Sequence, residues 1–189
     1  MATNQATATK VVTGKVRFSY LHVFEPYAME EGQEKKYSVS LLIPKSDKET
    51  IAKINKAIEA AKELAKAKFG GKLPAKFKLP MNDGDVDRPE DDNYAGCYFL
   101  NANAKTKPGL VDKDTNPILD QEELYSGCYG RASITFYPFD TSGNRGIACG
   151  LNNLQKLKDG EPLGGRVSAE VDFAEGFDDE GFDDEDDFL

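Results

Sequence analysis

The charged side chains of this 189-residue chain are divided unevenly along its length. All 24 Lys and Arg residues lie at or before Arg166, together with 22 of the 33 acidic residues, so the charge is about +2 up to that point and about −11 beyond it. The acidic end repeats Gly-Phe-Asp-Asp-Glu at 176–180 and 181–185. Its like charges and few aliphatic residues prevent the burial that would offset the entropy of ordering. We therefore predict a disordered acidic tail at 169–189, a folded domain at 13–168 and a flexible N-terminus at 1–12.

The cysteine and histidine content excludes several classes of protein. Cys97, Cys128 and Cys149 are an odd number without a Cys-x-x-Cys pair, and His22 is the only histidine. Neither a disulfide framework nor a zinc site is expected. The N-terminus lacks the cationic start and apolar run of a signal peptide, and no stretch has the apolar length that spans a bilayer. We expect a protein of the reducing cytoplasm that does not enter a membrane.

Two runs of alternating residues predict a long hairpin near the N-terminus. The first run places five even-numbered residues on one face: Val16, Phe18, Tyr20, His22 and Phe24. The second run covers 37–43 and stops at Pro44, which cannot donate to a sheet. The acidic segment 25–35 between them has the composition of a loop.

A helix is predicted to follow this hairpin. Ser46-Asp47-Lys48-Glu49 has the form of a capping box, in which Ser46 accepts from the backbone N–H of Glu49 and Glu49 reaches back to the N–H of Ser46. Apolar residues then recur at three- and four-residue spacing, and Gly70-Gly71 supplies the left-handed conformation that ends a helix. We interpret its lysine-rich opposite face as solvated surface.

Three later segments predict further strands. They are 98–104, the strongly alternating run 129–137, and a strand through 147–151 that follows the turn at 140–144. About five strands with one helix between them indicate a mainly β fold. We expect a five-stranded Greek-key barrel of the OB type with an inserted helix and loops, with Phe18, Phe99 and Phe136 in the core. The pattern leaves a generic α+β sandwich open.

The residues offer little support for catalysis. Asp83, Asp85 and Asp87 could gather a divalent metal for a nuclease, but Arg88 and Tyr94 stand where a calcium loop needs its Gly and its bidentate Glu. A single histidine provides no convincing catalytic triad, and the chain has no phosphate-binding glycine loop. We interpret the aspartates as an exposed acidic loop, and we predict a protein that is not an enzyme and binds no metal or cofactor.

Cationic and aromatic residues are interleaved along the predicted strands. A protein that binds single strands needs cations along the phosphates and aromatic faces on which unpaired bases stack. The slightly basic body is compatible with such a partner, although the net charge of −9 argues against one. The candidate DNA-binding residues are Lys15, Arg17, Tyr20, Lys35, Lys36, Tyr37, Tyr98, Lys105, Lys107, Tyr125, Tyr129, Arg131 and Tyr137.

Several segments of the body resemble one family. These are Arg-Phe-Ser-Tyr at 17–20, Ser-Gly-Cys-Tyr-Gly-Arg-Ala-Ser-Ile-Thr-Phe-Tyr at 126–137, Gly-Ile-Ala-Cys-Gly-Leu-Asn-Asn-Leu-Gln-Lys at 146–156 and Asp-Gly-Glu-Pro-Leu-Gly-Gly at 159–165. They are similar to single-stranded-DNA-binding proteins of tailed bacteriophages. The resemblance implies an OB fold, binding without strong sequence preference, and a role in phage DNA replication or recombination in the infected bacterial cell.

The end of the chain strengthens this resemblance, because such proteins commonly close an acidic segment with a hydrophobic residue or two. The candidate partner-binding residues are Asp186, Asp187, Phe188 and Leu189. An anionic tail can compete with DNA for a cationic groove and, once displaced, can anchor its apolar end in a replication or recombination protein of the phage or host. Two alternatives remain open. The tail could serve only to keep the protein soluble, and the protein could be an acidic protein-interaction or DNA-mimic protein that does not bind DNA. The sequence does not distinguish a monomer from a dimer.

Overall fold

The computed structural model describes residues 8–28, 30–141 and 143–163. The predicted tail, with Asp186, Asp187, Phe188 and Leu189, lies outside the described residues. The helical elements are α2 (Lys48–Lys68), α3 (Gly84–Asp87) and the 3-10 turn η1 (Asp92–Tyr94). The strands are β1 (Lys10–Val12), β2 (Val16–Tyr27), β3 (Lys36–Pro44), β4 (Phe77–Lys78), β5 (Met81–Asp83), β6 (Cys97–Ala104), β7 (Gly109–Val111), β8 (Tyr129–Thr141) and β9 (Asn144–Lys158).

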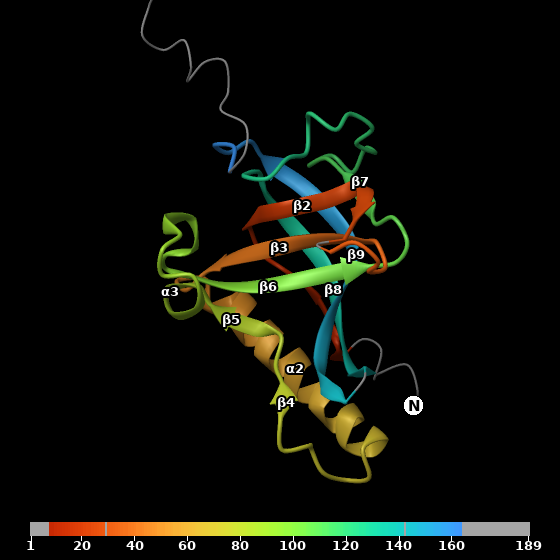
Figure 1. Ribbon diagram of the computed structural model, residues 1–189. Helices are drawn as coiled ribbons and strands as arrows, with labels where there is room; N and C mark the ends of the chain where they lie inside the picture. The colour runs from red at the N-terminus through yellow and green to blue at the C-terminus, as the bar shows by residue number, and fades with distance from the viewer. Residues whose placement is uncertain (1–7, 29, 142, 164–189) are drawn as a thin grey trace, which may run out of the picture.

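The five long strands close into a ring. β2 pairs with β3, β3 with β6, β6 with β9, β9 with β8, and β8 returns to β2. All of these pairings are antiparallel except that of β6 with β9. Figure 1 shows β2, β3 and β6 side by side, with β8 and β9 behind them. This closed arrangement of strands confirms the predicted mainly β fold of the OB type.

The inward residues of the strands form one core with a face of α2. Phe18 and Phe136 are buried in it, as predicted, beside apolar residues of every long strand. Helix α2 contributes Ile54, Ala57, Ile58, Ala61 and Ala65. Phe99 is buried too, but it packs with Leu42 and Tyr94 in a second, smaller cluster. The barrel therefore has apolar packing at two places.

The start of α2 differs from the predicted capping box. Asp47, not Ser46, caps the helix, and its carboxylate accepts from the backbone N–H of Thr50 at 3.2 Å. The Thr50 hydroxyl in turn accepts from the N–H of Gly14 at 2.9 Å, which ties the helix to the turn before β2. The predicted end is confirmed, because Gly70 and Gly71 follow the helix with positive φ.

The barrel also includes residues that the sequence placed in the flexible N-terminus. Lys10–Val12 form β1 and pair with Ser133–Thr135 of β8. Val11 is buried, so the apolar contact that it makes stabilises this edge strand. No helix in the described part of the chain has the length and apolarity required to cross a membrane.

The seam at which β8 meets β2 generates a stability prediction. A Cβ atom at Gly130 would overlap the backbone oxygen of Gln155 and lie 2.7 Å from the Phe18 ring. Because the backbone cannot yield, we expect Gly130→Ala to destabilise the protein by about 1–3 kcal/mol, seen as a lower melting temperature by circular dichroism. Gly150→Ala on β9 is the control, since the nearest atom to its added Cβ is 3.3 Å away. Equal melting temperatures for wild type and Gly130→Ala would contradict this packing.

Candidate nucleic-acid interface

Small polar side chains cover the outer face of three neighbouring strands. Ser38 of β3 lies opposite Asn103 of β6, and Ser40 lies opposite Asn101. His22 of β2 lies opposite Ser38 on the other side. Because alternate residues of a strand share a face, these residues point away from the core that Leu41 and Leu100 enter. The outer face of β2, β3 and β6 is therefore a polar surface.

An irregularity in β2 changes the alternation that the sequence predicts. Tyr20 has φ of 47°, and the register with β3 shifts between Ser19 and His22. Val16 and Phe18 face the core as expected, but after the shift Val23 is buried while Tyr20 is 54% exposed. The prediction that strict alternation keeps Tyr20 and His22 on the same face as Val16 and Phe18 therefore fails beyond Ser19. A bulge re-aims side chains in this way.

The outer face is hollowed into a groove of about 610 Å³, which we call the β2–β3–β6 groove. Aromatic and cationic side chains border its polar floor. The lining residues are Tyr20, His22, Tyr27, Ala28, Gln33, Glu34, Lys36, Ser38, Val39, Ser40, Arg88, Asn101 and Asn103.

Two aromatic rings of the groove are stacked on each other. The centroids of His22 and Tyr27 are 4.2 Å apart and their planes differ by 9°. Burial lowers the pKa of His22 below its usual value, which favours the neutral imidazole. His22 consequently supplies a flat ring surface, and the positive charge of the groove comes from Lys36 and Arg88.

The segment 84–96, which we call the insertion, covers the rest of the outer face. Tyr94 packs on Leu42 and Phe99, and its hydroxyl oxygen lies 3.4 Å from Ser19 Oγ and 3.3 Å from Ser40 Oγ. Figure 1 shows α3 of this insertion at one end of β3 and β6. The insertion therefore closes one end of the groove and brings Arg88 to it.

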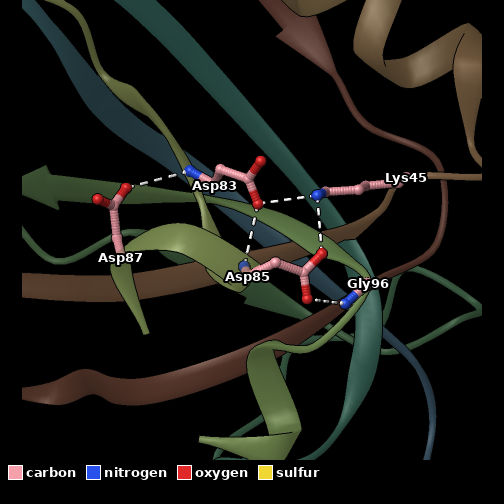
Figure 2. Close-up of polar contacts among 5 residues, drawn as sticks. All are labelled: Lys45, Asp83, Asp85, Asp87 and Gly96. Carbon is pink, nitrogen blue, oxygen red and sulfur yellow. Dashed lines mark hydrogen bonds and ion pairs between the residues drawn. The ribbon is translucent and has the colours of Figure 1, made fainter. Parts of the chain in front are cut away.

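An ion-pair cluster, the Lys45 clasp, fastens the insertion to the barrel. Lys45 Nζ lies 2.8 Å from Asp83 Oδ1 and 2.8 Å from Asp85 Oδ2, and the other oxygen of Asp85 accepts from the Gly96 N–H at 3.0 Å (Figure 2). The ammonium of Lys45 and this N–H hold the pKa of Asp85 below its usual range. The same two carboxylates raise the pKa of Lys45. The backbone N–H of Lys45 also donates to the Gly96 carbonyl at 2.9 Å, so both ends of the insertion are bound to the lysine that follows β3.

The clasp occupies the aspartates that the sequence suggested for a metal. Asp83 and Asp85 face the Lys45 ammonium, while Asp87 accepts from the backbone N–H of Asp83 at 3.2 Å. Among the described residues, no group of three His, Cys, Asp or Glu side chains could hold a metal ion. The geometry of these carboxylates is therefore that of a structural ion pair.

A second set of cations surrounds Tyr129 near the start of β8, and we call it the Tyr129 cluster. Lys15 Nζ lies 5.8 Å and Arg17 Cζ 5.3 Å from the ring centroid. Arg17 is fixed by hydrogen bonds that it donates to the carbonyl oxygens of Gly127 at 3.1 Å and Glu161 at 2.7 Å. A cation held over a ring in this way leaves other faces open to an anion.

Comparison with known proteins assigns the chain to a family. Residues 9–189 match the family model described as "Enterobacter phage Enc34, ssDNA-binding protein". The chain belongs to this family. It is also 32% identical, over 175 residues that cover 87% of it and 92% of the relative, to "Putative protein p50" of Acyrthosiphon pisum secondary endosymbiont phage 1.

Solved structures resemble this Enc34-family chain in fold. The single-stranded-DNA-binding protein of bacteriophage Enc34 in complex with ssDNA matches with a TM-score of 0.72 and 30% identity, covering 82% of this chain and 90% of that one. The single-stranded-DNA-binding protein gp2.5 of bacteriophage T7 matches with a TM-score of 0.57 and 14% identity over 92% and 97% of the two chains, which shows the fold alone. The predicted resemblance to phage proteins of this kind is confirmed.

The candidate DNA-binding residues of this family member lie in several places. Tyr20 and Lys36 line the groove, and Lys15, Arg17 and Tyr129 form the Tyr129 cluster. Exposed loop positions next to β3 and after β6 hold Lys35, Lys105 and Lys107.

The remaining candidates have their own contacts. The Tyr125 hydroxyl donates to the Gly160 carbonyl at 2.9 Å, and Arg131 donates to the Thr13 carbonyl at 3.1 Å. Tyr37 and Ser38 are on different faces of β3, and Tyr98 and Asn101 are on different faces of β6, so neither tyrosine shares the polar outer face. Tyr137 is 45% exposed farther along β8. The structure therefore does not bring the thirteen candidates into one site.

Sequence reasoning missed several residues of the groove. His22 was not among the candidate binding residues, and Tyr27 was placed in a loop although β2 extends to it. Arg88 was considered only as a residue that occupies the position at which a calcium loop needs a Gly. The signal for Ser38, Ser40, Asn101 and Asn103 was present, because they are the polar members of two alternating strands.

The Lys45 clasp predicts a pH-dependent effect of Asp85→Asn. The pKa of Asp85 is lowered in the fold, so its carboxylate stabilises the protein above the ordinary Asp pKa of about 3.9, and this contribution is lost as the pH falls through the lower folded value. We expect Asp85→Asn to melt a few degrees below wild type at pH 7, and we expect this difference to shrink as the pH falls below the ordinary Asp pKa of about 3.9. Glu90→Gln, an exposed change in the same insertion, is the control for thermal unfolding at each pH. A difference that persists unchanged at low pH would contradict the ion-pair account.

Proposed function

We propose that this chain binds single-stranded DNA, without strong sequence preference and without catalysis, through the β2–β3–β6 groove. The observation that carries this proposal is one groove lined by three aromatic rings, Tyr20, His22 and Tyr27, and two cations, Lys36 and Arg88. Stacking of bases on rings and pairing of phosphates with cations are the two interactions by which proteins hold single strands. Membership of the Enc34 family supports the same function.

The aromatic side chains of the groove favour binding of single-stranded DNA over binding of duplex DNA. In a duplex each base face is covered by its neighbours, so exposed rings gain no stacking partner. In a single strand every base has a free face, and stacking on an aromatic side chain contributes about 1–3 kcal/mol per base. Tyr20, which is 54% exposed, can lose further surface to such a base.

The floor of the groove supports binding that tolerates any sequence. Its side chains are the hydroxyls of Ser38 and Ser40 and the amides of Asn101 and Asn103. Each of these groups both donates and accepts hydrogen bonds, so each can satisfy a donor or an acceptor on a base edge. A floor of this kind offers little discrimination among bases.

The cations outside the groove extend the proposed path of the strand. Lys35, Lys105 and Lys107 are exposed near the end of the groove where β3 begins and β6 ends. The Tyr129 cluster offers a further ring with two cations. We propose that these groups meet phosphates and bases beyond the groove.

The broader role that we propose is protection of single-stranded intermediates in phage DNA replication or recombination, with partners recruited by residues 169–189. The body up to and including Arg166 carries about +2 and the remainder about −11, so the end of the chain can compete with DNA for the same cations. Leu163, the last residue that the structure describes, packs against the Leu42, Tyr94 and Phe99 cluster. The described part of the chain thus ends beside the insertion that borders the groove.

Binding to labelled oligonucleotides tests the proposed function directly. Fluorescence anisotropy should show tighter binding to a single strand than to a duplex of the same length, and the affinity should weaken as salt rises because counterions are released from the phosphates. Oligonucleotides of different base composition are the control for sequence preference. Equal affinity for single strand and duplex, or no binding at low salt, would refute the proposal.

Deleting residues 170–189 tests the competition between tail and DNA. The deletion removes all eleven carboxylates that follow Arg166, so we expect the shortened chain to bind single strands more tightly, with the larger gain at low salt. Deleting only Phe188 and Leu189 is the matched control, since it keeps those carboxylates and should leave DNA affinity unchanged. Unchanged or weaker binding after the longer deletion would reject self-competition.

A further inference from the structure

Arg88 reaches the groove from outside the barrel and lies among three aromatic rings. Its Cζ atom is 5.8 Å from the ring centroid of Tyr20, 5.5 Å from that of Tyr94 and 6.0 Å from that of Phe99. The side chain is partly buried and lines the groove. Rings attract a cation, but they accept none of the directed hydrogen bonds that its N–H groups can donate.

Arg88 has no carboxylate partner in the described part of the chain, unlike the cations that are held in ion pairs. Lys45 pairs with Asp83 and Asp85, Arg145 with Asp140, and Lys156 with Asp159. Within the described ranges, the Arg88 guanidinium takes part in no ion pair and donates no hydrogen bond. A partly buried guanidinium with its donors unused has lost hydration that an incoming anion would replace.

The backbone of Arg88 is held firmly. Its N–H donates to the Gly84 carbonyl at 3.1 Å, and its own carbonyl accepts from the N–H of Asp91 at 3.1 Å. Gly84 sits so close to the backbone that a Cβ atom there would overlap the carbonyl oxygen of Tyr94. The Lys45 clasp fastens the same segment at Asp83, Asp85 and Gly96, as Figure 2 shows. The guanidinium is therefore positioned before any ligand arrives, which reduces the entropy lost on binding.

We propose that Arg88 binds a backbone phosphate of the DNA strand at the insertion end of the groove. The planar fork of a guanidinium matches two phosphate oxygens, which a ring-bordered arginine without a carboxylate is free to engage. Tyr20 lies beside it and offers its exposed ring to the adjoining base, so phosphate and base contacts alternate as they do along a nucleotide chain. This inference rests on the proposed function and deepens it by assigning one phosphate contact to a residue of the insertion.

The salt dependence of binding tests this assignment in the full-length protein. Each phosphate contact adds about 0.7 to the steepness of the plot of log affinity against log salt for single strands. We expect Arg88→Gln to make this slope shallower by about 0.7 and to weaken binding about ten-fold at low salt, because a charge-assisted hydrogen bond is lost. Arg88→Lys should keep the slope and lose part of the affinity, since an ammonium has no planar fork.

Two further variants serve as controls on the same oligonucleotide. Tyr20→Leu should weaken binding without changing the slope, because it removes a ring and no charge. Arg145→Gln, which removes an arginine that is paired with Asp140 and lies over Phe69, should change neither affinity nor slope. Melting temperatures of all variants report whether each one folds.

The outcomes separate this inference from the proposed function. A wild-type protein that binds no single strand refutes the proposed function and with it the phosphate contact. A wild-type protein that binds, with the same slope in Arg88→Gln, overturns the phosphate contact alone. Arg88 would then have only a packing role on Tyr94 and Phe99, in which case both Arg88 variants would melt lower and neither would change the slope.

Discussion

The pairing of β8 with both β2 and β9 is the constraint on which the rest of this structure depends. It closes the sheet through Val16 and Arg17 of β2, and the inner face is filled by a single core. Where the long strands pair, their backbone donors and acceptors bind one another and are not free for a partner. Binding of a ligand by this barrel therefore depends on the side chains that point outward from its strands. The residues at those outward positions determine the chemistry of the surface.

The insertion determines how much of that outward surface is available. Tyr94 covers Ser19, Ser40 and Leu42, so only part of the outer face of β2, β3 and β6 remains as a groove. The insertion is short and has little apolar surface of its own, and the ion pairs of Lys45 fix it where packing alone is weak. Because each of these pairs is partly exposed, its strength comes from several charges acting together. One lysine at the end of β3 thereby connects the architecture of the barrel to the shape of the groove.

Local patterns predicted most of the fold but only part of the candidate site. Apolar residues that recur every second position predicted strands, and apolar residues that recur every 3.6 positions predicted the helix after Pro44. These elements are all present, the strands being predicted at 15–24, 37–43, 98–104 and 129–137. The bulge at Tyr20 interrupts the two-residue alternation of β2, and no Gly or Pro at that point of the sequence indicates it. Arg88 lies far in sequence from Tyr20, and the two lie side by side because the Lys45 clasp and the packing of Tyr94 hold the insertion against the barrel. Contacts between distant segments of this kind leave no periodic signal, so the groove could be recognised only after the chain was folded.

The weak charge of the body also limits how such a groove can hold a strand. Residues up to Arg166 carry about +2, so long-range attraction to DNA is small, and it is screened beyond about 8–10 Å in physiological salt. Several cations of the body are already neutralised within it, as Lys45 and Arg145 are. In the proposed complex, the stacking surfaces of Tyr20, His22 and Tyr27, which salt affects little, must then supply much of the affinity. The proposed binding would then owe its sensitivity to salt to a few well-placed cations, and the eleven carboxylates after Arg166 outnumber those cations, as the proposed competition requires.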